Sequence, residues 1–249
     1  MRGVLTTMLT LLRPASRTPG SRSSGSRPLR GRLLGSRALG SAVRGRRALL
    51  HAAAVSCAVD RGWPVLPGVL PAGDGCSCPR PDCPTPGAHP FDPPLLAATT
   101  DPRMVRWWWR QSPDAPLLVA TGQTVSAVSL PAASGARALE YFDTLRIRTG
   151  PVVATPTRYV LLVAPYSMQE LAELLIAQEW VPTSLRYHGS GGYLVLPPSR
   201  TGAGPVRWVR GAEEVTAPGA GPWLPTVGEL MGALVAASAA EPDGVRLAF

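Results

Sequence analysis

Residues 191–208 read GGYLVLPPSRTGAGPVRW, and this stretch decides the fold. A run of strand-forming residues stops at two successive prolines, turns through Ser199 and Gly202, and continues as a second apolar run that ends at Trp208. Proline lacks the N–H group that a sheet ladder needs, and serine and glycine favour tight turns. The pattern therefore predicts two strands joined by a proline-stiffened turn, which by itself is a hairpin that any β-containing fold could use.

Helical and strand patterns alternate along the rest of the chain. An Ala-rich run from Ala48 predicts a helix that leads into an apolar strand at 63–67, and a second helix is predicted between Thr100 and Pro113. Farther on, SMQELAELLIAQEW (167–180) begins with the capping box of another helix. Several strand patterns come as adjacent pairs, so we expect an α+β fold in which helices cover a mixed or antiparallel sheet.

The positive charge is concentrated near the N-terminus. The chain has 25 Arg, no Lys and 16 acidic residues, a formal net charge of +9. Eleven of the arginines precede residue 48 and the first acidic residue is Asp60, so the remainder carries 14 arginines against 16 acidic residues, a net of −2. We expect residues 1–47 to be a disordered Arg-rich tail, residues 48–240 to form one domain, and residues 241–249 to be a C-terminal tail.

The basic tail has three interpretations: an organelle transit peptide, a basic arm for nucleic acid, or an extension from a translation start assigned too far upstream. The use of Arg alone is typical of a GC-rich, actinobacterial-like composition. We therefore expect a cytoplasmic bacterial protein, or an organelle protein if the tail is a transit peptide. No window of eighteen consecutive apolar residues occurs, so a membrane partner is not expected.

The stretch GCSCPRPDCPTPGAHP (75–90) holds three of the four cysteines. Three thiolates and one imidazole are a complete tetrahedral ligand set for zinc, which leaves no position open for a substrate or an activated water. We therefore expect a structural Zn²⁺; free or disulfide-bonded cysteines are the alternative. The expected ligands are Cys76, Cys78, Cys83 and His89.

Two further motifs have both a structural and a functional interpretation. Val105, Trp108 and Trp109 share one face of the second predicted helix and are expected in the core, whereas Trp107 is expected to stay partly exposed. The alternative for the tryptophan run is a stacking platform for bases. His188 lies in RYHGSGGY without a serine or cysteine in a recognisable nucleophile turn, so we expect a hairpin end there rather than a general base.

From about Ala48 to Arg210 the chain resembles the N-terminal domain of the bifunctional primase/polymerases, members of the archaeo-eukaryotic primase superfamily. The matching segments occur in that family's order, and they are GWPVLP, CSC...C...PGAHP, ATTDPRMVRWWW, TGQTVSAVSLPAASG, ATPTRYVLLV and GSGGYLVLPPSRTGAGPVRW. The last of them, with its PPS, is the most specific. The resemblance implies a primase/polymerase-like fold and a role in DNA replication.

The resemblance also implies catalytic acids that this sequence lacks. In the family, an Asp-x-Asp pair at the end of one strand and a third acidic residue hold two divalent metals for nucleotidyl transfer. The corresponding positions here are Ser129, Pro131 and Arg186, and the TPTRYVLL segment lacks the family's phosphate-contacting histidine. These residues cannot replace carboxylate ligands, so we expect no catalytic Mg²⁺ and no catalytic residues.

We therefore expect an inactive domain that serves as an interaction or regulatory module for nucleic acid or a replication-related protein. The net charge of −2 after residue 47 argues against strong non-specific DNA binding. One alternative is an active primase/polymerase whose acids come from Asp114, Glu140 or Asp143; another is a purely structural or protein-interaction protein. The candidate nucleotide or nucleic-acid contacts are Arg158, Arg186, Ser199, Arg200 and Arg207.

Overall fold

Helix α1 (Leu34–Val59) opens the part of the chain that the computed structural model describes, which comprises residues 34–73, 75–211 and 221–239. The alanines, leucines and arginines before Ala48 are good helix formers, and they extend the predicted helix toward the N-terminus. The helix thus includes residues 34–47, which the sequence pattern assigned to the disordered tail. The tails predicted for residues 1–33 and 241–249 lie outside the described residues.

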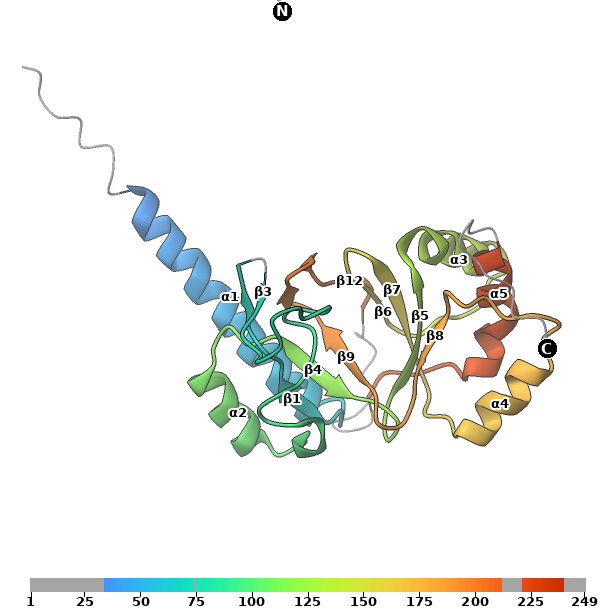
Figure 1. Ribbon diagram of the computed structural model, residues 1–249, viewed down its shortest axis with the longest axis horizontal. Helices are drawn as coiled ribbons and strands as arrows, with labels where there is room; N and C mark the ends of the chain where they lie inside the picture. The colour runs from blue at the N-terminus through green and yellow to red at the C-terminus, as the bar shows by residue number, and fades with distance from the viewer. Residues whose placement is uncertain (1–33, 74, 212–220, 240–249) are drawn as a thin grey trace, which may run out of the picture.

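A small antiparallel sheet and two helices form one half of the molecule. The sheet is ordered β1-β4-β9, and its strands are Val65–Pro67, Leu117–Ala120 and Tyr193–Leu196. Helix α2 (Pro102–Gln111) packs against α1 and β1, and this half occupies the left of Figure 1.

Helix α2 has the structure that its sequence predicts. Asp101 is the N-cap, because its carboxylate accepts a hydrogen bond from the amide of Arg103 at 2.8 Å. Trp108 and Trp109 are buried on the face of the helix that meets the core, whereas Trp107 is 49% exposed. The interpretation of the tryptophan run as core packing is therefore confirmed for two of the three rings.

The other half is a five-stranded antiparallel sheet covered by three helices. The sheet is ordered β12-β6-β7-β5-β8, and its strands are Arg207–Arg210, Val152–Ala154, Arg158–Val163, Ser126–Pro131 and Arg186–His188. The helices lie to the right of the sheet in Figure 1 and are α3 (Ala132–Thr144), α4 (Met168–Ile176) and α5 (Val227–Ala239). This arrangement confirms the predicted α+β class.

The five-stranded sheet has two different faces, because side chains alternate along each strand. Val128, Leu130 and Leu161 point to one face and pack with the three helices in one core, which we call the helix-side core. Ala127 and Val160 point to the other face and pack in a second core with residues of the three-stranded sheet. The five-stranded sheet therefore lies between the helices and the first half of the molecule.

The chain crosses between the two sheets where the sequence pattern predicted hairpins. Strands β8 and β9, on either side of the GSGG turn, belong to different sheets. The 191–208 stretch behaves likewise, since β9 pairs with β4 while β12 pairs with β6. Only a minimal hairpin of β10 (Arg200–Thr201) and β11 (Gly204–Pro205) lies between them. Alternating apolar residues predict a strand but not its neighbour, which is why the hairpin interpretation was wrong at both places.

Two of the crossovers pack backbone to backbone. Gly122 has φ +107°, and a Cβ at this position would lie 2.3 Å from the Cα of Ser190. The amide of Thr121 donates to the carbonyl of Gly192 at 2.9 Å, and its hydroxyl donates to the carbonyl of Gly189 at 2.6 Å. These contacts hold the connection between β4 and β5 next to the connection between β8 and β9.

Candidate functional site

Ser129, which stands at the first expected acid position, lies in β5 and is only 1% exposed. In the strand register it is opposite Val160 of β7 and Arg186 of β8, and Ala127 is opposite His188. Directly opposed residues of antiparallel strands place their side chains on the same face. Ser129, Arg186 and His188 therefore share the face of the sheet that is turned toward the three-stranded half.

Arg158 and His188 both form hydrogen bonds with Ser129. Arg158 Nε donates to Ser129 Oγ at 3.1 Å, and its Nη2 donates to the carbonyl oxygens of Ser129 and Ser184, each at 2.7 Å. Ser129 Oγ also lies 2.9 Å from His188 Nε2. A guanidinium can only donate, so the serine hydroxyl accepts from Arg158, and its own hydrogen is available for Nε2. The pKa of His188 is lowered to about 4, so the imidazole is neutral at pH 7 and Nε2 can accept that hydrogen.

The electrostatics of this region are set by the positive charges of two arginines. Burial, and then the charge of Arg186, lowers the pKa of Arg158 from 12.5 to about 10. Burial, followed by the charges of both arginines, lowers the pKa of His188 from 6.5 to about 4. Among the described residues, neither arginine forms an ion pair with a carboxylate. We call this group, Ser129, Arg158, Arg186 and His188, the cationic face.

The membership of His188 in this group was not predicted from the sequence. The only catalytic role considered for His188 was that of a general base, which needs a recognisable nucleophile turn, and the sequence contains none beside it. The signal that could have found it is the two-residue spacing from Arg186, because residues i and i+2 of a strand point to the same face. Pro131, the second of the three expected acid positions, ends β5 opposite Arg158.

Ser199 lies in the interior rather than at a ligand surface. It is fully buried, and its Oγ accepts a hydrogen bond from the amide of Leu117 at 2.8 Å. The same residue's carbonyl accepts from the amide of Val206 at 2.9 Å. These bonds connect the turn after β9 to the start of β4, so the hydroxyl of Ser199 has a structural role.

Arg200 and Arg207 lie apart from the cationic face. Arg200 is exposed and lines a cavity of about 510 Å³ together with Arg46 of α1. Arg207 is opposite Ala154, which is opposite Tyr159 on the neighbouring strand, and Tyr159 packs with the helix-side core. Arg207 therefore projects from the opposite face of the five-stranded sheet, and the predicted phosphate contacts do not form one surface.

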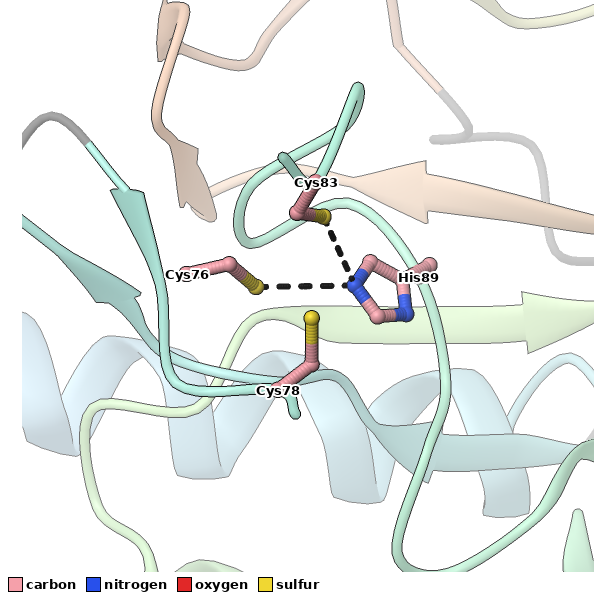
Figure 2. A group of neighbouring side chains, drawn as sticks. All are labelled: Cys76, Cys78, Cys83 and His89. Atoms are coloured by element: carbon pink, nitrogen blue, oxygen red, sulfur yellow. Dashed lines mark hydrogen bonds between the residues drawn. The ribbon is translucent and has the colours of Figure 1, made fainter. Parts of the chain in front are cut away.

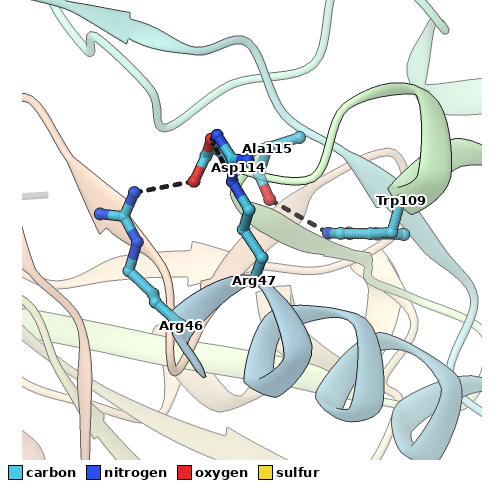
Figure 3. Close-up of polar contacts among 5 residues, drawn as sticks. All are labelled: Arg46, Arg47, Trp109, Asp114 and Ala115. Carbon is cyan, nitrogen blue, oxygen red and sulfur yellow. Dashed lines mark hydrogen bonds and ion pairs between the residues drawn. The ribbon is translucent and has the colours of Figure 1, made fainter. Parts of the chain in front are cut away.

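Asp114 is held in the other half of the molecule. Its carboxylate pairs with Arg46 at 2.8 Å and with Arg47 at 2.6 Å, as Figure 3 shows. Beside it, Trp109 Nε1 donates to the carbonyl of Ala115 at 3.1 Å. These contacts join α1 to the connection between α2 and β4, and they explain why the arginines at the end of the predicted tail belong to the fold.

The two other alternative acids lie across the sheet from Ser129. Glu140 and Asp143 are exposed residues of α3, whose apolar residues pack in the helix-side core. Asp143 also forms an ion pair with Arg210 of β12. Neither carboxylate is on the face that carries Arg158 and Arg186.

The cysteine-rich loop brings its four expected ligands together. It begins in a small hairpin of β2 (Pro71–Ala72) and β3 (Gly75–Cys76), and a short 3-10 helix (Leu95–Ala97) follows it. The ligand atoms of Cys76, Cys78, Cys83 and His89 all lie within 4.8 Å of one another, and Figure 2 shows them pointing to a common centre.

The distances in this cluster fit a tetrahedral metal. The Sγ atoms of Cys76 and Cys83 are 3.5 and 3.2 Å from Nε2 of His89. In a tetrahedral zinc site with bonds of about 2.0–2.3 Å, neighbouring ligand atoms are roughly 3.5 Å apart. The cluster could therefore bind a metal such as zinc.

Neighbouring groups favour the metal-binding forms of two ligands, His89 and Cys76. His89 Nδ1 lies 2.9 Å from the carbonyl oxygen of Pro90, which can only accept, so Nδ1 carries the hydrogen and Nε2 is free for a metal. Burial raises the pKa of Cys76, but hydrogen bonds from the backbone N–H groups of Gly87 and Cys78, together with the side-chain contact to His89, outweigh it and lower that pKa to about 6. A thiolate is the form of cysteine that binds metal.

Comparison with protein-family models matches residues 54–222 to the bifunctional DNA primase/polymerase N-terminal domain, Prim-Pol. The chain belongs to this family. The matched range includes the cysteine-rich loop, the cationic face and all the strands of both main sheets, and it confirms the resemblance drawn from the motifs. Membership of the Prim-Pol family suggests an interaction with nucleic acid.

The chain matches no curated protein and no solved structure. In the described part of the chain, no helix is both long enough and apolar enough to cross a membrane.

Proposed function

We propose that this Prim-Pol domain does not catalyse nucleotidyl transfer and acts instead as an interaction module for nucleic acid or a replication-related protein. The observation that carries the proposal is the cationic face. Where the family resemblance implies metal-binding carboxylates, the chain has a serine that is hydrogen-bonded to Arg158, and Arg186 stands opposite that serine. Mg²⁺ takes oxygen ligands and is stabilised by their negative charge, so two guanidinium groups at this place oppose its binding.

The positions of the alternative acids support the same conclusion. Asp114 is engaged by two arginines in the other half of the molecule. Glu140 and Asp143 lie on α3, across the five-stranded sheet. A two-metal site needs its carboxylates within reach of one pair of ions, and these three acids do not meet that condition.

Primer extension tests the proposal. The full chain is incubated with a primed template, all four nucleotides and either Mg²⁺ or Mn²⁺, beside an active polymerase as positive control and heat-inactivated protein as background. We expect no incorporation above background with either metal. Template-dependent incorporation by the full chain would overturn the proposal and favour the enzyme with relocated acids.

A metal-binding measurement tests the assignment of the three acid positions independently of activity. The variant Ser129→Asp, Pro131→Asp, Arg186→Asp restores the carboxylates that the resemblance implies. Binding of Mn²⁺ is followed by the loss of the free-ion electron paramagnetic resonance signal. We expect the variant to bind Mn²⁺ more tightly than the unmodified chain does; equal binding by the two proteins contradicts the assignment.

We further propose that the cysteine-rich loop binds one structural Zn²⁺. A complete ligand set and a proline-rich backbone favour a metal that holds the loop rather than one that reacts. Metal analysis of the purified chain should give about one zinc per molecule. The variant Cys78→Ser, Cys83→Ser should lose it, whereas Cys57→Ala, which changes a buried cysteine of α1, should keep it. Zinc retained by the double variant would exclude this site.

A further inference from the structure

We propose that the cationic face binds a phosphate group, carried by a free nucleotide or by the end of a nucleic-acid strand, without a divalent metal. This inference rests on the proposed function, because it requires a face that holds no catalytic metal. It assigns the binding to Arg158 and Arg186 and excludes Ser199, Arg200 and Arg207.

Arg158 is held in place with one nitrogen available. Its Nε and Nη2 atoms are fixed by three hydrogen bonds to Ser129 and Ser184. Its remaining terminal nitrogen, Nη1, has no hydrogen-bond partner among the described residues, and it is not among the buried atoms that lack one, so it reaches solvent. A guanidinium that is already oriented by the protein loses little conformational entropy when an anion binds to it.

Arg186 supplies the second cation. Its side chain is exposed, and it forms no ion pair with a carboxylate of the described residues. The strand register places it directly opposite Ser129, whose hydroxyl Arg158 contacts from the other neighbouring strand. The two guanidinium groups, on the strands that flank β5, repel each other, and an anion that contacts both of them removes this repulsion.

A phosphate fits this pair better than other anions. The fork of N–H donors on a guanidinium matches the oxygens of a phosphate, and charge-assisted bonds of this kind are strong. Beyond residue 47 the chain carries 14 arginines against 16 acidic residues, so in this part of the chain phosphate binding depends on the local pair rather than on net charge. The two arginines supply the positive charge that metals supply in an active site, so a metal is not needed.

The expected effect of Mg²⁺ is therefore opposite to that in a metal-dependent polymerase. Mg²⁺ bound to a triphosphate neutralises part of its charge and occupies oxygens that the arginines would contact. We expect the affinity for ATP to be highest without divalent metal and to fall when millimolar Mg²⁺ is added.

Calorimetric titration of the full, zinc-loaded chain with ATP provides the test. The buffer is freed of divalent metals with a chelating resin, because EDTA would compete for the proposed zinc. Arg186→Gln should weaken ATP binding about tenfold or more, since it removes a charged donor. The matched control is Arg207→Gln, which removes an exposed arginine from the opposite face of the same sheet and should leave the affinity unchanged. Arg158 is not substituted, because it also holds Ser129.

Two further titrations identify the source of the phosphate. A single-stranded oligonucleotide with a 5′-phosphate is compared with the same oligonucleotide without it. Tighter binding of the phosphorylated strand, lost in Arg186→Gln, assigns strand ends as ligands, whereas binding of ATP alone assigns free nucleotides. Both results support the phosphate site.

Three results would overturn the inference: no binding of either ligand, binding that requires Mg²⁺, or equal losses in Arg186→Gln and Arg207→Gln. These results test the phosphate site, whereas primer extension tests the inactive-domain proposal. Absence of phosphate binding together with absence of incorporation removes this site and leaves the inactive-domain proposal intact, whereas incorporation of nucleotides removes the inactive-domain proposal itself.

Discussion

Acidification from pH 7 to pH 5 should destabilise the fold through His188. The imidazole accepts a hydrogen bond from Ser129 and lies near Arg158 and Arg186, and burial and these charges lower its pKa to about 4. In the unfolded chain the same side chain titrates near its ordinary value of 6.5. Between about pH 4 and pH 6.5 the unfolded chain binds more protons than the folded one. The free energy of unfolding therefore falls as the pH falls through this window.

The two pKa values of His188 set the size of the effect. A difference of one pKa unit corresponds to about 1.4 kcal/mol, so the complete loss, reached below pH 4, is about 3 kcal/mol. At pH 5 the folded imidazole is still mostly neutral while the unfolded one is charged, and about 2 kcal/mol of the stability present at pH 7 has been lost. For a domain of ordinary stability this is a large fraction of the total.

Urea unfolding followed by tryptophan fluorescence at pH 7, 6 and 5 measures the effect. The comparison is with His188→Gln, whose amide oxygen can accept the hydrogen bond from Ser129 but does not titrate. Protonation of the cysteine-rich loop affects both proteins equally, so the difference between them isolates His188. The unmodified chain should lose about 2 kcal/mol more than the variant between pH 7 and pH 5. Equal losses would refute the reasoning, because the folded imidazole would then accept a proton as readily as the unfolded one.

Two further predictions concern stability. Ser199→Ala should lower the free energy of unfolding by about 1–3 kcal/mol in urea titration at pH 7, because it leaves the buried amide of Leu117 without its acceptor; no change would mean that another acceptor replaces it. Gly135→Ala should cost about 1–3 kcal/mol, because the added Cβ would lie 2.4 Å from the Cβ of Tyr159. The control Gly45→Ala meets no atom within 4 Å on α1 and should stabilise by about 0.5–1 kcal/mol; equal effects at the two glycines would contradict the packing argument.

Local patterns predicted the elements of this fold well. The N-cap at Asp101 and the capping interaction of Ser167, which accepts from the amide of Glu170 at 3.0 Å, follow from residues three or fewer positions apart. The burial of Trp108 and Trp109 follows from helical spacing. Such features depend on chain neighbours, so one sequence contains the information that fixes them.

The pairing of strands could not be predicted in the same way. A strand at 193–196 has the same apolar pattern whether it pairs with β8 or with β4, and the structure pairs it with β4. The deciding contacts are the close approach of Gly122 to Ser190 and the bond between Thr121 and Gly189, which join residues far apart in the sequence. Alternation along one strand contains no signal for them.

The two candidate sites differ in the same respect. The four ligands of the cysteine-rich loop lie within fourteen residues, and their spacing alone predicted the cluster that forms. The cationic face is assembled from three strands, and its composition was only partly predicted. The resemblance indicated Ser129 and Arg186, while the contact of His188 with Ser129 required the strand register.

The 191–208 stretch connects three parts of the molecule. Ser199 binds the amide of Leu117 in the three-stranded sheet, and the amide of Gly202 donates to the carbonyl of Pro86 in the cysteine-rich loop at 2.7 Å. Gly204 lies so close to Pro156, in the turn between β6 and β7, that a Cβ would be 2.9 Å from its ring.

The motif that carries the family resemblance is therefore required to assemble the two halves, whether or not the domain catalyses a reaction. The three acid positions that the resemblance implies, on β5 and β8, lie outside this motif. Ser129 is hydrogen-bonded to Arg158 and His188, and the side chain of Arg186 is exposed. A match to the motif consequently indicates the fold, and the residues on β5 and β8 must be considered separately before catalysis is inferred.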